Sequence, residues 1–471
     1  MQEVTGSSPV PPTIEAWGRF CCFNYFKQFT SCYVILPFLE QVFGIFYIKR
    51  RSGGTEETGG AEGTGVFASF CEAETPVPFA LLLFCLKVFG LAVEKLCSCT
   101  KNTITEKNRT GGFSMDERLM LLKEMSELPG VSGFEDEVRK YIRGHMEEFS
   151  EVTKDNIGSL ICKKQGLNET PKIMIAGHMD EIGMMVTYIT KEGFLKFQTL
   201  GGWWEQVMLA QRVVVKTSNG DVPGIIGSKP PHILKSEERK KVTEKDQMFI
   251  DIGASSKEDA ESMGVMPGDP VVPYSPFQQM KNPKYLMGKA WDNRVGCAIF
   301  MEVIKELSKE DHPNTIYGVG TVQEEVGLRG ATTSVAAVEP DIGFALEVDI
   351  AGDTPGIQEF EAQAKLGKGP SILLYDSSMV PHRKLRDFVI QTAKESNIPI
   401  QFNAMAGGGT DAGRIHLYKT GVPSLVIGVP ARYIHSHAGI IHRDDFDGAV
   451  SLLVELAKRL DADAVAEIKA D

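Results

Sequence analysis

Four short segments of the chain bring carboxylate and imidazole side chains close together. Glu324 and Glu325 are adjacent, in the segment QEEVGLRGA at 323–331 that directly follows an apolar, β-branched run at 315–322. The other three segments are AGHMDEIG at 176–183, AWDNRVG at 290–296 and RYIHSH at 432–437. Imidazole and carboxylate together suit Zn²⁺ or Co²⁺, and neighbouring acids can divide metal binding and proton transfer between them. These segments predict a hydrolase with two divalent metal ions.

Two of these residues gain a role from their neighbours. His178 lies two residues before Asp180, in the turn after a predicted strand. An acid at this spacing can orient a metal-bound imidazole through its second ring nitrogen. Asp292 opens a predicted helix, where an isolated aspartate is most often a helix cap. Beside the other motifs we expect it instead to bridge the two ions, because an anionic group with two oxygens can bind both.

The adjacent glutamates are expected to share the work between them. Successive side chains on a strand point to opposite faces. One of Glu324 and Glu325 can then face a metal ion while the other faces the attacking water. A solvated pair of acids in a loop is the ordinary alternative, and the neighbouring ligand types disfavour it.

Sequence position leaves two ligands undecided. Glu347 and Asp349 are two residues apart on a predicted strand and therefore share a face, so either can be a terminal ligand. His435 and His437 have the same spacing after the last predicted strand. One of these histidines is expected to bind metal, and the other to lie at the surface or beside a ligand.

A glycine-rich segment, GGGTDAG at 407–413, is a candidate substrate contact. It lacks the Gly-Lys-Ser/Thr ending of a phosphate-binding loop, which disfavours nucleotide binding. Glycines allow a backbone to approach a ligand closely. The predicted substrate-binding residues are Gly408, Gly409, Thr410 and Asp411.

Helical and strand patterns alternate from Met115 onward. They predict helices over 135–149, 292–307, 385–395 and 444–460, and strands over 173–176, 315–322, 342–348 and 424–429. Residues 182–275 differ, because short β-branched runs such as MMVTYIT and RVVVKT alternate there with turn residues. We predict an α/β fold in which an α/β/α sandwich, formed by 115–181 and 276–471, carries an inserted all-β, barrel-like domain at 182–275.

Composition narrows the possible partners and the compartment. The 471 residues carry a net charge of −12 and offer no basic stripe, so nucleic acid is not an expected partner. Nine cysteines are present, and only Cys162 and Cys297 lie beyond residue 99. That usage predicts that the later part of the chain is a reduced, cytoplasmic protein without a disulfide framework.

The first 114 residues differ from the rest. Their apolar stretches at 29–48 and 76–96 are interrupted by proline and charged residues, so we expect no membrane insertion. The opening MQEVTGSSPVPPTI resembles peptides that are produced when a transfer-RNA gene is translated by mistake. Met115, in contrast, begins a segment that looks like the natural N-terminus of an enzyme. We predict that 1–114 come from a misplaced start codon and have no stable fold. Peptides from this region in the native protein would refute the prediction.

The motifs GHMDEIG, WDNR, VQEEVGLRGA, EVDIAGDTPG, GGGTDAG and RYIHSH, taken together and in this order, resemble the M42 family of metallo-aminopeptidases. The similarity extends from about Met115 to the C-terminus. It implies a peptidase that uses two metal ions, zinc or cobalt with manganese also possible, to remove N-terminal residues from short peptides. It also implies dimers formed through the β insertion, which assemble into a dodecamer.

The resemblance also implies a role for each site residue. Asp292 would bridge the ions, with His178 and Glu347 completing one site and Glu325 and His435 the other. Glu324 would be the general base and Asp180 the orienting acid. Many members have aspartate at the position of Glu347, which keeps Asp349 as its rival.

Two other classes of protein share part of this pattern. A glycoside hydrolase needs paired acids but no metal, and the histidines argue against it. A non-catalytic scaffold of the same fold would have no reason to keep a full set of carboxylates whose burial is costly without metal.

Overall fold

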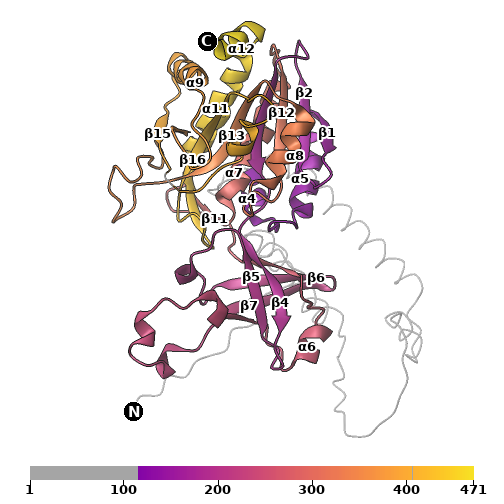
Figure 1. Cartoon of the computed structure of the whole chain (residues 1–471), viewed down its shortest axis with the longest axis vertical. Helices are drawn as coiled ribbons and strands as arrows, with labels where there is room; N and C mark the ends of the chain where they lie inside the picture. Colours follow the sequence, from indigo (N-terminus) through magenta and orange to yellow (C-terminus); the bar gives the residue numbers. More distant parts are fainter. Residues whose placement is uncertain (1–114, 406, 471) are drawn as a thin grey trace, which may run out of the picture. The chain divides into compact units, whose positions relative to one another are not determined.

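The computed structural model describes residues 115–405 and 407–470. They form an α/β domain and a smaller closed β-barrel (Figure 1). The predicted extension at 1–114 lies outside the described residues. Among the residues described, no helix is long and apolar enough to cross a membrane.

The α/β domain is built on an 11-stranded mixed sheet. Its four central strands, in the order β12-β3-β13-β16, are parallel. Their bounds are Thr315–Thr321 for β12, Lys172–His178 for β3, Ile342–Ile350 for β13 and Ser424–Arg432 for β16. The outer strands are β1 (Glu151–Lys154), β2 (Leu160–Gln165), β17 (Gly439–His442), β11 (Tyr285–Gly288), β10 (Gln278–Gln279), β14 (Ser371–Leu373) and β15 (Gln401–Asn403).

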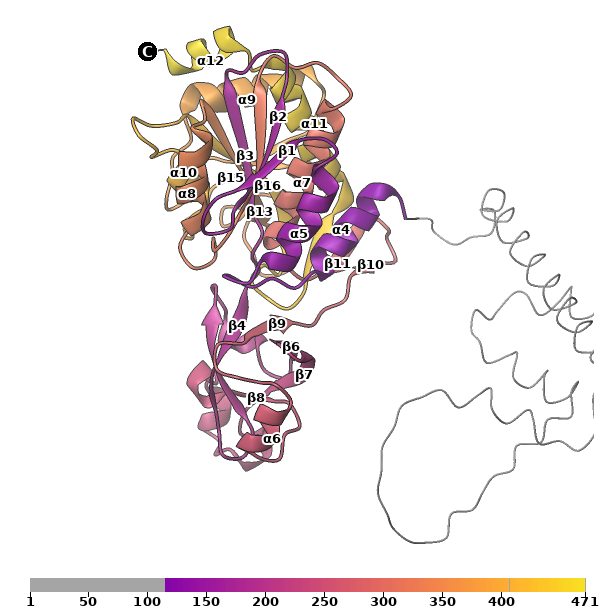
Figure 2. The same ribbon diagram turned by 90° about the vertical axis from the view of Figure 1, so that its right-hand side faces the viewer.

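Helices cover both faces of this sheet, as Figure 2 shows. On one face lie α4 (Glu117–Glu127), α5 (Asp136–Met146), α7 (Trp291–Leu307), α9 (Arg383–Glu395) and α11 (Arg443–Arg459). On the other lie α8 (Arg329–Val338) and α10 (Ala412–Ile415). The C-terminal helix is α12 (Ala462–Lys469).

The alternation of side chains along β3 explains why both faces must be covered. Ile173 and Ile175 join the core under the larger helix layer, while Met174 and Ala176 join the core under α8 and α10. A strand buried on both faces reads as a continuous apolar run, as the sequence indicated. The predicted α/β/α sandwich is confirmed.

The barrel has six antiparallel strands in the closed order β4-β5-β8-β7-β6-β9. Their bounds are Gly183–Ile189 (β4), Leu195–Leu200 (β5), Phe249–Asp251 (β8), Gly220–Gly227 (β7), Arg212–Thr217 (β6) and Pro270–Pro273 (β9). A separate apolar core that includes Met184, Val215 and Ile250 fills it. Helix α6 (Lys257–Ser262) packs at its side. The predicted barrel-like insertion is therefore present.

Parallel strands present their carboxyl ends at one edge of the sheet, where α/β proteins commonly bind ligands. Here β3 ends at His178 and β12 ends at Thr321, directly opposite it in the ladder. Glu347 follows Ala345, the last residue of β13 that pairs with β3, by two positions. Candidate ligands far apart in sequence thus meet at one edge.

Candidate metal centre

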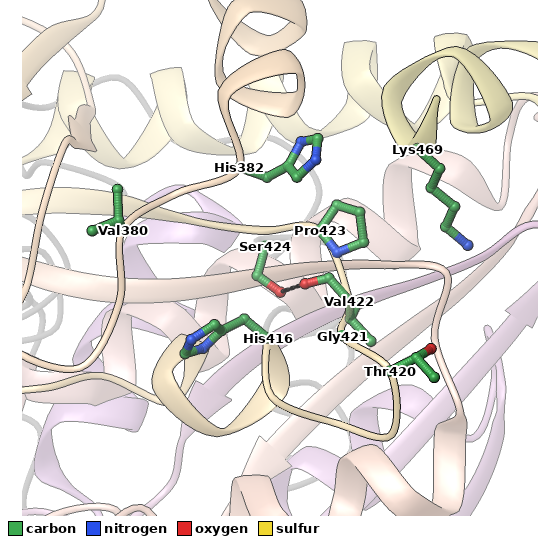
Figure 3. Close-up of a pocket in the computed structure, with 9 residues that line it drawn as sticks. All are labelled: Val380, His382, His416, Thr420, Gly421, Val422, Pro423, Ser424 and Lys469. Carbon is green, nitrogen blue, oxygen red and sulfur yellow. Dashed lines mark hydrogen bonds between the residues drawn. The ribbon is translucent and has the colours of Figure 1, made fainter. Parts of the chain in front are cut away.

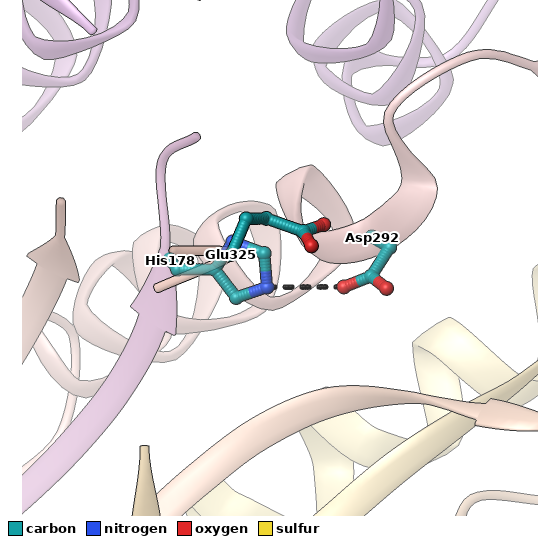
Figure 4. A group of neighbouring side chains, drawn as sticks. All are labelled: His178, Asp292 and Glu325. Atoms are coloured by element: carbon teal, nitrogen blue, oxygen red, sulfur yellow. Dashed lines mark hydrogen bonds and ion pairs between the residues drawn. The ribbon is translucent and has the colours of Figure 1, made fainter. Parts of the chain in front are cut away.

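His178 lies at the centre of the converging side chains and is almost fully buried. Its Nε2 atom is 3.0 Å from Oδ1 of Asp292, 3.7 Å from Oε2 of Glu324 and 3.8 Å from Oε2 of Glu347. Figure 4 shows the ring from β3 facing the carboxylate of Asp292, with Glu325 beside them. The imidazole therefore faces three acids from three different segments.

The other side of the His178 ring meets Asp180. Nδ1 is 3.0 Å from the main-chain oxygen of Asp180 and 3.5 Å from its carboxylate. The carboxylate also accepts hydrogen bonds from the Ser132 hydroxyl at 2.6 Å and from the backbone N–H groups of Glu324 and Glu325. Burial would raise the pKa of Asp180, but hydrogen bonds from His178 and Ser132 hold it below its ordinary value.

Asp292 stands between two histidines. Its Oδ1 faces His178, and its Oδ2 is 3.3 Å from Nε2 of His435. The backbone of Asp292 and Asn293 departs from helical geometry, and the residue at the cap position of α7 is Ala290. Asp292 therefore does not serve as the helix cap, the ordinary role for an aspartate there. Burial opposes ionisation, but the two histidines lower its pKa.

The adjacent glutamates lie in a turn, whereas strand geometry was predicted for them. Strand β12 ends at Thr321, one residue before the predicted end, and Glu324 and Glu325 lie in the turn that follows. Strand pleating therefore does not separate their side chains. They still face different histidines, because Oε2 of Glu324 is 3.7 Å from His178 while Oε2 of Glu325 is 3.6 Å from His435.

The structure separates Glu347 from Asp349. Glu347 faces His178 and accepts a hydrogen bond from Nδ2 of Asn293 at 3.1 Å. Asp349 points to a different neighbour, since its Oδ1 accepts a hydrogen bond from Nδ2 of Asn403 at 2.7 Å. Only Glu347 joins the cluster around His178.

The two histidines of RYIHSH are also separated. His435 faces Asp292 and Glu325 through Nε2, and its Nδ1 is 2.7 Å from the carbonyl oxygen of Gly202. His437 is buried, and neither of its ring nitrogens has a hydrogen-bond partner within the described ranges. Its ring packs against Trp203 instead. Burial lowers the pKa of His437 to about 4, so this ring is neutral.

Asp411 is the member of the glycine-rich segment that lies next to the cluster. Its Oδ2 accepts a hydrogen bond from the Thr321 hydroxyl at the end of β12, while its Oδ1 is buried without a partner in the part of the chain that is described. Burial raises the pKa of Asp411 to about 6, against the opposing effect of His178.

The other three predicted substrate contacts lie against the turn at 376–378. The carbonyl of Gly408 accepts a hydrogen bond from the backbone N–H of Ser377 at 3.0 Å, and the hydroxyl of Thr410 donates to Asp376 at 2.9 Å. A Cβ on Gly409 would lie 3.0 Å from the side chain of Ser378. Packing against Ser378 therefore favours glycine at 409 whether or not a ligand is bound.

Sequence reasoning missed three residues that hold the cluster in place. Asn293 binds Glu347, Ser132 binds Asp180 and Gly202 binds His435. Asn293 follows Asp292 directly and could have been suspected on that ground. The other two belong to distant segments that carry no recognisable signal.

The donor set fits divalent metal ions. Two groups each offer ligand atoms that all lie within 4.8 Å of one another, namely His178 with Asp292 and Glu325, and His178 with Glu324 and Glu347. A small cavity touches Asp292, Glu325 and His435 together. Carboxylates and imidazoles at such spacing are ligands for zinc, cobalt or manganese.

The charges of the cluster lead to the same conclusion. Burial raises the pKa of Glu324 and of Glu347 well above the ordinary value and that of Glu325 to about 8. The Oε1 atoms of Glu325 and Glu347 are buried and have no hydrogen-bond partner among the residues described. Cations would stabilise these crowded acids, because buried charges are tolerated when they are paired or coordinate metal.

A larger hollow, of about 450 Å³, lies elsewhere in the α/β domain (Figure 3). Its lining includes His382, His416, Ser424 and Lys469, and none of the predicted site residues. Ser424 begins β16, so this hollow lies at the amino end of that strand. The acids meet instead at the carboxyl ends of the parallel strands.

Comparison with known proteins identifies the family. The sequence profile described as M42 glutamyl aminopeptidase matches residues 158–452. The chain belongs to the M42 family. The glutamyl aminopeptidase of Lactococcus lactis is 36% identical to this M42 chain over 352 residues, which are 74% of this chain and 98% of the relative.

Solved structures agree with this M42 assignment. A TET aminopeptidase from a marine sediment archaeon, Thaumarchaeota archaeon SCGC AB-539-E09, is 52% identical with a TM-score of 0.74, covering 75% of this chain and 99% of the other. The TET1 peptidase of Pyrococcus horikoshii, described as able to assemble into a tetrahedron or a large octahedral shell, is 34% identical with a TM-score of 0.67, covering 73% and 100%. The M42 chain is therefore a peptidase.

Proposed function

We propose that this peptidase is a dinuclear metal-dependent aminopeptidase that removes N-terminal residues from short peptides. The observation that carries the proposal is the position of Asp292, whose two carboxylate oxygens each face a different histidine. A carboxylate shared in this way is suited to bridge two cations. His178 and Glu347 would complete one ion site, and Glu325 and His435 the other.

Bound ions would polarise the peptide carbonyl and lower the pKa of the attacking water. The rest of the chemistry belongs to Glu324. Its carboxylate accepts the proton of the attacking water and later donates it to the leaving amine, which is the work of a general base and acid. Its backbone N–H is held by Asp180, so the side chain extends from a fixed point beside His178.

Asp180 is proposed as the orienting acid, acting on two sides. Its main-chain oxygen accepts a hydrogen bond from Nδ1 of His178, which leaves the Nε2 atom of the same ring to bind an ion among the acids. Its carboxylate fixes the turn that carries Glu324 and Glu325. Asp411 and the adjoining residues Gly408, Gly409 and Thr410 remain our candidates for substrate contact, supported by the position of Asp411 beside the acids.

The alternative of a metal-independent glycoside hydrolase is disfavoured by the histidines at the centre of the acid cluster. A chelator experiment on two substrates separates the two readings. We expect complete, reversible loss of aminoacyl-nitroanilide hydrolysis after metal removal, with no activity on a cellulose-like polymer. Full peptidase activity after demetallation would refute the dinuclear mechanism. A scaffold without activity would hydrolyse neither substrate in any metal.

Zinc and cobalt are the proposed ions, with manganese also possible, since the donor set admits all three. Demetallated protein should be reloaded with each ion and tested on leucyl, glutamyl and lysyl nitroanilides. The native ion is the one that gives the reloaded protein its highest turnover and that is also found in freshly isolated protein.

We propose self-association as dimers through the barrel and then as a dodecamer, supported by the assemblies described for TET peptidases. Light scattering coupled to size exclusion tests this, and a monomer at micromolar concentration would contradict it. A cytoplasmic location is supported by Cys162 and Cys297, which are free and buried thiols.

A further inference from the structure

The barrel reaches into the proposed metal centre through one short segment. After β5 ends at Leu200, residues 201–203, Gly-Gly-Trp, pass beside the loop that carries His435. The carbonyl oxygen of Gly202 is 2.7 Å from Nδ1 of His435. We infer that Gly202 and Trp203 of the barrel position His435, so that the inserted module completes the second ion site. This inference rests on the proposed function.

The hydrogen bond sets the state of the imidazole. A carbonyl oxygen can only accept, so Nδ1 of His435 carries a proton, and in the neutral, metal-binding form of the imidazole the lone pair lies on Nε2. Nε2 then faces Oδ2 of Asp292 at 3.3 Å and Oε2 of Glu325 at 3.6 Å. Partners of this kind fix the tautomer and ring orientation of a metal ligand.

The two glycines leave no room between the barrel and the ligands. A Cβ on Gly202 would lie 3.0 Å from Nδ1 of His435. A Cβ on Gly201 would lie 2.5 Å from the side chain of Ile182 and 3.0 Å from Oε2 of Glu325. Gly201 also has a φ of +87°, which only glycine adopts without strain. The backbone therefore contacts His435 directly and leaves no space for a side chain beside Glu325, the two proposed ligands of one ion site.

Trp203 anchors this segment on both sides. Its indole N–H donates to the carbonyl of Gly183 at 3.0 Å, at the start of β4, and its ring packs against the barrel core. On the other side its ring centroid is 5.1 Å from that of His437, two residues beyond His435. The contact matters because the loop is strained, with a left-handed φ of 55° at His435.

The neighbouring residue provides a matched control. Trp204 follows Trp203 directly but is 57% exposed. If Trp203 positions the ligand, its replacement should affect ion binding while the same replacement at Trp204 should not. Trp203→Phe keeps an aromatic ring against His437 and removes only the indole N–H, so it should rescue most of the effect of Trp203→Ala.

The test measures cobalt binding to demetallated full-length protein by calorimetry, together with the visible absorption of the bound Co²⁺. The parent should bind two ions per chain. In Gly202→Val and Trp203→Ala we expect one of the two ions to bind roughly 10–100-fold more weakly, the range for lost outer partners of a ligand. The visible absorption spectrum of the Co²⁺ bound at that site should also change, because the arrangement of its ligands changes. Trp204→Ala should match the parent, and Trp203→Phe should lie much closer to the parent than Trp203→Ala does.

The outcomes separate this inference from the proposed function. A parent that binds no pair of ions would refute the dinuclear function itself. A parent that binds two, with parental affinities and spectra in Gly202→Val and Trp203→Ala, would overturn only the positioning role. An equal loss of ion affinity in Trp204→Ala would also overturn the positioning role, because the loss would then follow from replacing any tryptophan in this segment. If Gly202→Val does not fold by circular dichroism, the three tryptophan variants decide.

Discussion

The carboxylate of Asp180 accepts a hydrogen bond from the backbone N–H of Glu324 at 3.0 Å. The same carboxylate binds the N–H of Glu325 and the hydroxyl of Ser132, and the main-chain oxygen of Asp180 meets Nδ1 of His178. The strands that precede these residues, β3 and β12, are parallel neighbours. A single aspartate therefore links the central imidazole to both acids.

Asp180→Asn should weaken this link. Three donors converge on the two oxygens of the carboxylate. Asparagine has only one accepting oxygen and places an NH₂ group where the other oxygen was, so at least one of the three donors loses its hydrogen bond and faces another donor. We expect the free energy of unfolding to fall by about 1.5–3 kcal/mol, the range for hydrogen bonds to charged groups, and turnover to fall with it. Denaturant unfolding measures the first. Ser132→Ala is the comparison variant: it removes one donor and leaves both backbone N–H groups bound to the carboxylate, so it should lose less stability than Asp180→Asn. Parental stability and turnover in Asp180→Asn would contradict the role.

Glu324→Gln should keep metal and lose catalysis. The amide is similar in size to the carboxylate but cannot accept the proton of the water, so turnover should fall by roughly two to four powers of ten. Metal content by mass spectrometry should stay parental. Glu192→Gln, at an exposed turn of the barrel, is the control and should be fully active. A Glu324→Gln enzyme with normal turnover would show that another group moves the proton.

The sequence was sufficient for the fold class and for most of the cluster. Residue periodicity located β3, β13 and α11 to within a few residues, because strands buried on both faces and amphipathic helices leave clear patterns. The convergence of His178 and Glu347 then follows from the meeting of carboxyl strand ends at one edge.

What the sequence could not provide was register and turn geometry. The choice between Glu347 and Asp349 depends on Ala345 pairing with Ala176, a long-range register that no local pattern encodes. The acid pair was expected on a strand, but Gln323 adopts a left-handed φ of 53° and turns the chain before Glu324. The Gly202 contact to His435 joins residues 233 positions apart and depends on how the barrel meets the sandwich.

The pair Glu347 and Asp349 can be separated by two isosteric changes. Glu347→Gln should weaken the binding of one ion, because it removes a negatively charged ligand. The loss should be at least the roughly 10–100-fold that is typical when a residue that only hydrogen-bonds to a ligand is replaced. Asp349→Asn should keep both ions, since its carboxylate is directed at Asn403. Competition with a chelator measures both affinities. The reverse result, with Asp349→Asn losing an ion and Glu347→Gln keeping two, would exchange the two assignments.

The metal-free protein should become less stable as pH rises through neutrality. Burial and the nearby Asp292 raise the pKa of Glu325 to about 8 from 4.5. Burial would lower the pKa of His435, but Asp292 and Glu325 raise it to about 9 from 6.5. Between pH 6.5 and 8 the folded cluster therefore keeps protons that the unfolded chain releases, so the free energy of unfolding falls as pH increases.

Metal should remove much of this dependence, because cations replace the protons and their binding releases them. Thermal unfolding of chelator-treated protein at pH 6.5 and 8 measures the fall, and the same melts with added Zn²⁺ measure its reversal. Glu325→Gln is the control, since the metal-free variant lacks one of the two titrating groups and should show a shallower fall. Metal-free protein that gains stability from pH 6.5 to 8 would mean that the cluster does not hold protons in place of cations.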